Sequence, residues 1–390
     1  MTSPAGDRRP LSVRLSRAFT SRLRTPRLTS QLGVALGAAF GICFVTGYLS
    51  HAIQHPPWWF AWPSRPVSLY RVTQGLHVAT GLVAIPLLAA KLWAVFPRLV
   101  KWPSVRDVRA LVERLSLLVL VAAATFQLVT GVLNIARWYR AMGFFFTTAH
   151  YWTAWLAVGA LLVHVGVKLP LTRRALKARV RPVRGEQHGL TRRGLLATVA
   201  GAAGVVTVAT AGQTVRPLAG LSLLAPRDPR VGPQGLPVNR SAVRAGVVRA
   251  ATDPAFRLEL VGPSGTRTLS LSLADLGALP QHTVDLPITC VEGWSAGARW
   301  TGVRLRDLVA AAGGDEHASV RVLSLQRRGR YGSSTVAPPH ARDPLTLIAL
   351  KLHGEPLHLD HGFPCRLIAP NRPGVLQTKW VRRIVVERAS

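Results

Sequence analysis

Residues 31–50, QLGVALGAAFGICFVTGYLS, are mostly apolar and contain no charged side chain. A stretch of this kind can cross the hydrocarbon core of a bilayer, which takes about 20 helical residues. Three further stretches of similar composition follow at 72–96, 115–136 and 149–168. A weaker fifth stretch at 194–212 consists mainly of Ala, Gly, Val and Thr. The sequence therefore predicts a transmembrane helical bundle of four helices plus a fifth.

The charge of the chain is strongly basic and unevenly distributed, with a formal net charge of +32. Only four of the 17 acidic residues (Asp7, Asp107, Glu113 and Glu186) precede residue 212. A soluble nucleic-acid-binding protein can be equally basic, but it would not contain several membrane-length apolar stretches. Basic segments beside membrane spans are expected to contact anionic lipid. We therefore expect membrane lipid, and no nucleic acid, as a partner.

The positions of the basic residues predict how the chain crosses the membrane. Segments 1–30, 97–114 and 169–193 carry seven, five and eight Lys or Arg residues, whereas 51–71 and 136–149 carry two each. Cytoplasmic segments are the ones enriched in Lys and Arg. We expect a multi-pass protein of the cell membrane with a cytoplasmic N-terminus. An odd number of spans places everything after residue 212 outside the cytoplasm.

The fifth stretch begins with Thr191-Arg192-Arg193-Gly194-Leu195-Leu196. This motif resembles a twin-arginine export signal, which carries folded proteins across the membrane. The alternative is that Arg192 and Arg193 are ordinary cytoplasmic flanking charges.

The chain after residue 235 changes to short β-type runs, such as 256–260, 268–273, 319–325 and 381–386. Short helical segments such as 305–312 lie between these runs. Strands interspersed with short helices predict an α+β domain.

One segment of this domain, ITCVEGWSAGARWTGVRLRDLV at 288–309, resembles the metal-ligand segment of the sulfite oxidase family. It is also similar to the related periplasmic methionine-sulfoxide reductase catalytic subunits. The resemblance implies that Cys290 binds molybdenum beside the dithiolene of a molybdopterin cofactor, and a thiolate is a suitable soft ligand. The alternatives are a buried structural cysteine or a disulfide with Cys365. With only Cys43 besides these two, a four-thiolate iron–sulfur cluster is excluded.

A second segment, HLDHGFPCRLIAPNRPGVLQTKWVRRIVV at 358–386, resembles the part of the same family that binds the pterin phosphate. An arginine fork and a lysine suit a buried phosphate, although a basic residue can also be a solvated surface charge. His361 stands where the methionine-sulfoxide reductase branch is expected to have asparagine, so the resemblance does not identify the substrate. The cofactor contacts that the resemblance implies are Asn239, Ser324, His361, Arg366 and Lys379.

Four histidines lie in or beside the expected spans: His51, His77, His150 and His164. His150 and His164 are 14 residues apart, about 21 Å along one helix face. This pattern resembles the bacterial di-haem cytochrome b subunits of formate dehydrogenases and hydrogenases, which implies one or two b haems. The expected depths pair His77 with His150, leave His164 without a histidine partner, and make His51 a further candidate. The alternative is that the histidines bond to neighbouring helices or water.

These resemblances imply a multidomain, membrane-anchored molybdenum oxidoreductase that performs oxygen-atom transfer or reduction on a small molecule outside the cytoplasm. It is expected to exchange electrons with membrane quinone through b-type haem. Two alternatives remain open, a haem-free anchor with a separate redox partner and a non-catalytic, membrane-held binding protein. The expected organisation is a basic cytoplasmic tail (1–30), a four-helix cytochrome b-like membrane domain (31–170), a basic cytoplasmic loop (171–193), a fifth transmembrane helix with the twin-arginine motif (194–212), a linker (213–234) and a sulfite-oxidase-like molybdopterin domain (235–390).

Overall fold

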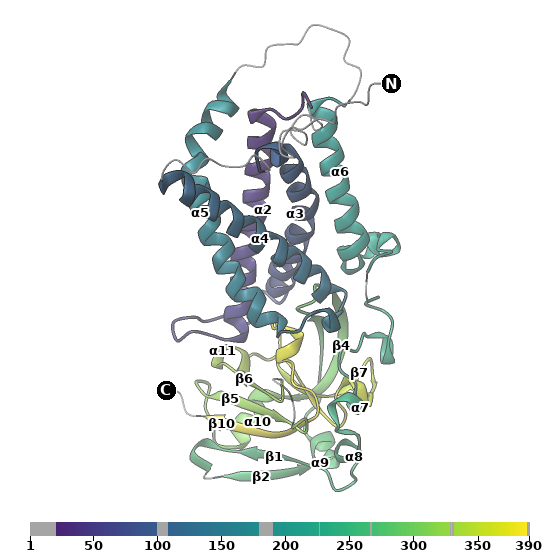
Figure 1. The fold of residues 1–390 in the computed structure, drawn as a ribbon. Coiled ribbons are helices and arrows are strands. Elements are labelled where there is room, and N and C mark those ends of the chain that lie inside the picture. Colours follow the sequence, from purple (N-terminus) through teal and green to yellow (C-terminus); the bar gives the residue numbers. More distant parts are fainter. Residues whose placement is uncertain are drawn as a thin grey trace, which may run out of the picture. The chain divides into compact units, whose positions relative to one another are not determined.

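The structure is a computed structural model that describes residues 21–99, 108–178, 190–225, 227–265, 267–327, 329 and 331–387. Most of the expected basic tail and residues 179–189 of the expected basic loop lie outside these ranges. Within them, five helices are long and apolar enough to cross a membrane. These helices are α2 (Pro26–Gln54), α3 (Leu69–Leu99), α4 (Val108–Ile135), α5 (Phe146–Lys177) and α6 (Arg192–Ala211). A sheet-containing domain follows them, as expected (Figure 1).

Helices α2 and α3 lie side by side (Figure 1). Leu32 of α2 and Ala84 of α3 belong to one buried cluster, in which small side chains allow close approach of the helices. Lys91 Nζ on α3 donates a hydrogen bond of 2.6 Å to the Thr29 carbonyl oxygen of α2. The ammonium group is thereby bound to a helix carbonyl oxygen, which reduces the cost of placing it among apolar helices.

Helices α4 and α5 are joined by polar contacts as well as by packing. The expected third span begins at residue 115 and leaves out Glu113, whereas α4 begins at Val108 and includes it. Glu113 forms an ion pair with Lys168 of α5. Pairing reduces the cost of a carboxylate within an otherwise apolar helix, so the helix can continue beyond the apolar stretch.

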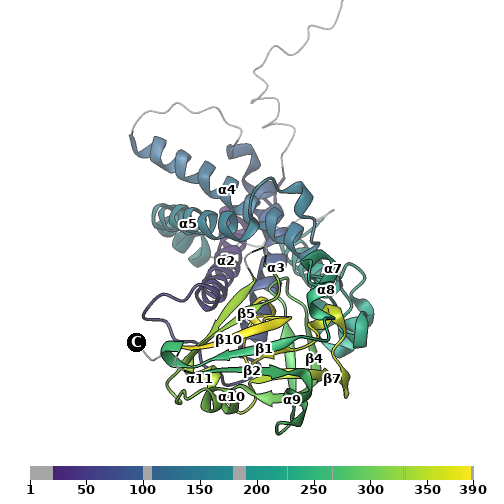
Figure 2. The same cartoon turned by 90° about the horizontal axis from the view of Figure 1, so that it is seen from below.

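The sheet domain contains two five-stranded sheets. The first has the order β2-β1-β10-β5-β6, in which only β1 and β10 are parallel. Figure 2 shows β2, β1, β10 and β5 side by side. Its strands are β1 (Arg257–Val261), β2 (Thr268–Ser272), β5 (Ser319–Ser324), β6 (Ser333–Val336) and β10 (Val381–Glu387). The second has the order β3-β4-β7-β8, with β9 also paired to β7. Its strands are β3 (His282–Thr289), β4 (Ser295–Arg304), β7 (Leu347–Leu352), β8 (Glu355–Pro356) and β9 (Arg366–Ile368).

Short helices connect the strands and lead into the domain. The α-helices are α7 (Ala242–Ala245), α8 (Val248–Ala251), α9 (Leu273–Ala278), α10 (Leu305–Ala311) and α11 (Pro338–Ala341). The 3₁₀ turns are η2 (Gly212–Thr214), η3 (Arg216–Leu221), η4 (Pro233–Gly235), η5 (Pro263–Gly265), η6 (Leu359–His361) and η7 (Gly374–Leu376). A further 3₁₀ turn, η1 (Tyr139–Ala141), lies between α4 and α5. Helix α9 begins with a reciprocal capping box between Ser272 and Asp275, which satisfies two backbone N–H groups.

Strand β7 is buried on both faces and separates two hydrophobic clusters. Ile348 and Leu350 contribute to a core that contains side chains of both sheets. Leu347 and Ala349 point to the opposite face and join a second cluster, which contains Trp300 and Cys290. Because successive side chains of a strand point to opposite faces, β7 contributes to both clusters. The second of these clusters contains Cys290, the candidate metal ligand.

The chain divides into two compact units, but the division is not a single boundary after α6. One unit consists of Met1–Gly47 and Leu76–Thr210, and the other of Tyr48–Gly75 and Ala211–Ser390. The second unit therefore includes the end of α2, the loop that follows it and the start of α3. We call Tyr48–Gly75 the hairpin segment.

Candidate functional site

Cys290 lies in a tight turn that connects β3 with β4. Its N–H donates to the Trp294 carbonyl oxygen over 2.8 Å, and the Gly293 N–H donates to the Cys290 carbonyl oxygen over 3.1 Å. Gly293 has a φ of 98°, a left-handed conformation that glycine adopts without steric cost. The paired strands below the turn, joined up to Thr289 and Ser295, hold it in place.

N–H donors from Asn239 and Glu292 approach the Cys290 sulfur. Asn239 Nδ2 lies 3.1 Å from Sγ, and the Glu292 backbone nitrogen lies 3.5 Å from it. Asn239 Nδ2 is also 3.1 Å from Glu292 Oε2, and Trp294 Nε1 donates to the same oxygen over 3.4 Å. Donors directed at a sulfur stabilise negative charge on it, which suits a thiolate that binds a metal.

Glu292 is a candidate site residue that was not among the contacts expected from the sequence. Its side chain is buried and belongs to the hydrogen-bonded group around Cys290. The sequence did contain an indication of this role, because Glu292 is an acidic residue in an otherwise apolar turn, two positions after the proposed metal ligand. Its burial, however, depends on the contact with Asn239, which lies 53 residues away in the sequence.

The disulfide alternative does not apply, because Cys290 and Cys365 form no disulfide in the structure. Cys365 lies in the core shared by the two sheets, whereas Cys290 lies in the second cluster. Burial raises the pKa of Cys365 to about 12, so this group remains a neutral thiol at ordinary pH. Cys365 therefore lacks the thiolate character that a metal ligand needs.

Arg366 begins β9 and is buried, so it is not a solvated surface charge. Its Nη1 donates to the His361 carbonyl oxygen over 3.0 Å, and its guanidinium carbon lies 5.0 Å from the centroid of the Trp300 ring. Its Nε is buried without a hydrogen-bond partner among the described residues. Burial lowers the pKa of Arg366 to about 9. A buried guanidinium with an unused donor is a suitable anion-binding group.

Lys379 precedes β10 and lies close to Arg366. Its Nζ donates to the Asp360 carbonyl oxygen over 2.8 Å and lies 4.4 Å from the centroid of the Trp380 ring. Burial, followed by repulsion from Arg366, lowers the pKa of Lys379 to about 7. Two cations that share a buried region cost free energy unless a negative group joins them.

The remaining predicted contacts belong to the same region. Ser324 Oγ donates to the Lys379 carbonyl oxygen over 2.7 Å. His361 Nε2 lies 2.6 Å from the Pro233 carbonyl oxygen, and burial lowers its pKa to about 4. His361 is therefore neutral at ordinary pH and donates through Nε2. The structure thus brings His361, Arg366, Lys379 and Ser324 together, and places Asn239 at Cys290.

The backbone at Gly362 packs closely against the residues that carry these cations. Gly362 has a φ of 112°, and a Cβ on it would crowd the Arg366 Cβ at 3.0 Å and the Lys379 Cβ at 3.1 Å. The unused Arg366 Nε and the neighbouring Lys379 ammonium fit the phosphate of a molybdopterin. Cys290 would then be the protein ligand of the metal. Within the described ranges, no group of three or more His, Cys, Asp or Glu residues forms an alternative metal site.

We expect Lys379→Met to lower the molybdenum and pterin content of the purified protein by roughly tenfold or more, since one charge-assisted contact to phosphate is lost. Metal analysis and pterin fluorescence measure both quantities. Lys351→Met is the matched control, because Lys351 is exposed on β7 of the same domain. A full pterin content in the Lys379→Met protein would contradict the phosphate assignment.

The structure also brings His77 of α3 and His150 of α5 together. Their ring centroids are 6.3 Å apart. His77 Nδ1 lies 2.8 Å from the Cys43 carbonyl oxygen, and His150 Nδ1 lies 3.2 Å from Thr130 Oγ1. Both rings are thus oriented through Nδ1, which is how metal-binding histidines are usually held when Nε2 is the ligand.

The other two histidine candidates have different neighbours. His164, also on α5, has Lys91, Lys168 and Glu113 as charged neighbours. His51 lies near the end of α2, with its ring centroid 4.9 Å from that of His55.

Comparisons with known proteins identify the sheet domain. Residues 245–390 match the family model described as the oxidoreductase molybdopterin binding domain. Mouse mitochondrial sulfite oxidase is 35% identical over a region that covers 34% of this chain and 29% of the mouse protein. Chicken sulfite oxidase is 34% identical, covering 36% of each chain. Nitrate reductase from Neurospora crassa is 37% identical, covering 24% of this chain and 11% of that protein.

These similarities are limited to part of each protein. The chain spans roughly a third of the length of the sulfite oxidases that it matches. Among solved structures, the sulfane dehydrogenase SoxCD from Paracoccus pantotrophus aligns with a TM-score of 0.32 and 22% identity, covering 35% of this chain and 40% of that chain. The range that matches the family model begins after α6, so it includes none of the candidate haem ligands.

Proposed function

We propose that the molybdopterin-binding oxidoreductase domain at residues 245–390 catalyses oxygen-atom transfer to or from a small oxyanion outside the cytoplasm. The observation that carries this proposal is the hydrogen-bonded Cys290 turn in the same domain as the buried Arg366 and the half-buried Lys379. When bound, the molybdenum cofactor supplies the two-electron chemistry. The protein contributes the thiolate, the phosphate contacts and the orientation of the substrate.

Asn239 and Glu292 have distinct roles in this site. The Asn239 amide bridges the Cys290 sulfur and Glu292 Oε2, so it fixes the distance between the metal ligand and the carboxylate. Glu292 Oε2 is the atom that can hold a proton taken up or released during oxygen transfer. The Trp294 indole N–H keeps this oxygen oriented toward Asn239.

Arg372 and His340 support an anionic substrate. Pro373 forms a β-bridge with Thr289, so the backbone of Arg372 runs beside the Cys290 turn. Arg372 Nη1 and His340 Nε2 are both buried without hydrogen-bond partners among the described residues. Burial lowers the pKa of Arg372 only to about 10, so the guanidinium stays charged at neutral pH. The relatives named sulfite oxidase and nitrate reductase take their names from small oxyanions.

The test uses the purified, detergent-solubilised protein, which we expect to contain molybdenum and to turn over a small oxyanion with a soluble dye. Arg372→Met should raise the KM for that anion by roughly 10- to 100-fold, the effect of losing a charged hydrogen bond. Arg342→Met is the matched control, because Arg342 is an exposed arginine of the same domain.

A neutral sulfoxide provides the comparison that distinguishes substrate binding from general damage. Its KM should change little in the Arg372→Met protein. Equal losses with the anion and the sulfoxide would contradict an anion-binding role for Arg372. A purified protein without molybdenum would contradict the catalytic proposal and favour a membrane-held binding protein.

The helical region is proposed to anchor the enzyme in the cell membrane and to carry electrons between molybdenum and quinone. Five apolar helices and the basic residues that flank them support the anchor. The twin-arginine motif at the start of α6 supports export of a folded domain. Two imidazoles bound to one metal, each at about 2 Å, would have ring centroids roughly 6 Å apart. The 6.3 Å between the His77 and His150 centroids supports one b haem between them.

A further inference from the structure

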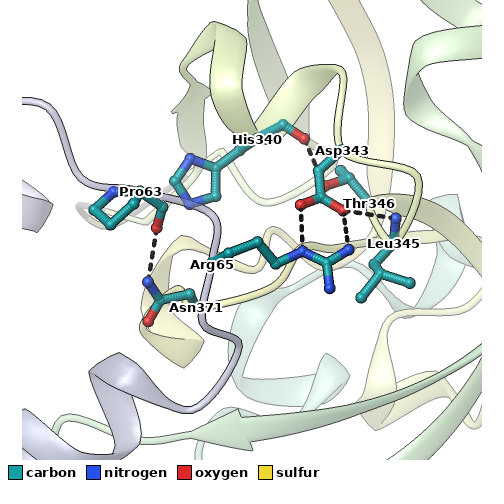
Figure 3. A network of polar contacts seen from close by, with 7 residues as sticks. All are labelled: Pro63, Arg65, His340, Asp343, Leu345, Thr346 and Asn371. Carbon is teal, nitrogen blue, oxygen red and sulfur yellow. Dashed lines mark hydrogen bonds and ion pairs between the residues drawn. The ribbon is translucent and has the colours of Figure 1, made fainter.

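The hairpin segment is bound to the sheet domain through an ion pair between the exposed Arg65 and the buried Asp343. Arg65 Nε and Nη2 donate to Asp343 Oδ2 and Oδ1 over 3.0 and 3.1 Å, in the bidentate geometry of an arginine–carboxylate pair (Figure 3). Burial raises the pKa of Asp343, but the hydrogen bonds from Arg65 and the Leu345 N–H outweigh this effect and hold the pKa below its usual value. Asp343 is therefore a charged, fixed anchor for the hairpin segment.

A second anchor is Asn371, which has a φ of 54°. Both the nitrogen and the oxygen of its side-chain amide form hydrogen bonds with the hairpin segment. Its Nδ2 donates to the Pro63 carbonyl oxygen over 2.7 Å (Figure 3), and its Oδ1 accepts from the Tyr70 N–H over 2.6 Å. The Asn371 carbonyl oxygen accepts from Trp62 Nε1 over 2.9 Å. Asn371 immediately precedes Arg372, so these bonds also fix the turn that carries the proposed anion-binding residue.

The third contact reaches the Cys290 turn itself. Gln74 is buried, and its Nε2 donates to the Val291 carbonyl oxygen over 2.8 Å. That carbonyl and the Glu292 N–H belong to the same peptide group, and this N–H points to the Cys290 sulfur. Because a trans peptide is planar, its N–H and C=O point in opposite directions. The Gln74 amide therefore fixes the direction of the N–H that faces the sulfur.

We propose that the hairpin segment is part of the molybdenum site and that Gln74 is a positioning residue for the Cys290 ligand. The proposal rests on the proposed function, in which Cys290 binds molybdenum. Gln74 acts through the Val291–Glu292 peptide, and a hydrogen bond to its C=O also polarises its N–H toward the sulfur. A loop between two membrane helices thereby contributes to the electronic environment of the metal.

This arrangement predicts the direction of an effect on the reduction potential. An N–H donor to a ligand sulfur draws negative charge away from the metal, which stabilises the reduced form and raises the potential. Without Gln74, the peptide is free to rotate and its N–H is less polarised. The potential of the molybdenum centre should then shift to a more negative value.

The test is a redox titration of the molybdenum centre, followed by electron paramagnetic resonance, in the full-length holoprotein. Gln74→Ala and Gln74→Leu should both shift the potential to more negative values, because leucine restores the volume but not the N–H donor. Gln54→Ala is the matched control, since Gln54 lies in the same segment and bonds only to Ser50 of its own helix among the described contacts. Its potential should equal that of the wild type.

Arg65→Ala separates the local effect from general loosening of the hairpin segment. It removes the Asp343 ion pair but leaves the Gln74 donor, so we expect a smaller shift than with Gln74→Leu. An equal or larger shift would overturn the proposal, as would a wild-type potential in Gln74→Leu. A wild-type protein without molybdenum, or a Cys290→Ser protein with an unchanged signal, would instead reject the proposed function on which the inference rests.

Discussion

Replacement of Cys290 by serine is expected to abolish turnover while the protein still folds and retains its pterin. The hydroxyl is a poorer ligand for a soft metal than the thiolate, although it fits the same buried position. We expect the rate with artificial electron donors or acceptors to fall by more than about 100-fold, the upper range for losing an outer-sphere partner of a metal. Steady-state kinetics and pterin fluorescence measure the two parts of this prediction.

Cys365→Ala is the matched control for this variant. Cys365 is equally buried in the same domain, but its raised pKa keeps it neutral and its sulfur contacts the Val381 carbonyl oxygen. We expect the control to lose some stability through a small cavity while it keeps its molybdenum and its turnover. Wild-type activity in Cys290→Ser would mean that the ligand assignment is wrong.

The sequence predicted the helical region well because the signal for a membrane helix is local. A run of apolar side chains is sufficient to identify each of the five helices, whatever else the chain does. Their ends were less predictable, as α4 shows. Its first turns contain Glu113, whose charge is offset by Lys168 on another helix. No property of the sequence around Glu113 indicates that partner.

The residues of the candidate site were likewise predictable only where a local stretch of sequence indicates their role. Cys290, Arg366 and Lys379 could be selected because each lies in a contiguous segment that resembles a known family. Gln74 could not be selected in this way, because it lies in an expected membrane span and contacts Val291, 217 residues further along the chain. Polar residues in a span are functional candidates, but the partner becomes known only from the fold.

His77→Ala is expected to remove the b-type haem absorbance of the purified protein, wholly if one haem is bound and by about half if two are bound. The reason is that the His77 ring faces His150, with centroids 6.3 Å apart, and iron would lose one of its two axial ligands. Turnover linked to quinone should fall to background. Turnover with a soluble dye that reaches molybdenum directly should be spared, because His77 is not part of the Cys290 turn.

His164→Ala is the matched control on α5, the helix that also carries His150. Its charged neighbours are Lys91, Lys168 and Glu113, so we expect the absorbance assigned to His77 and His150 to remain. A loss of about half the absorbance in this variant would indicate a second haem with a different partner ligand. If the wild-type protein shows no haem spectrum after expression with ample haem, the helices are an anchor, and molybdenum exchanges its electrons with a separate redox partner.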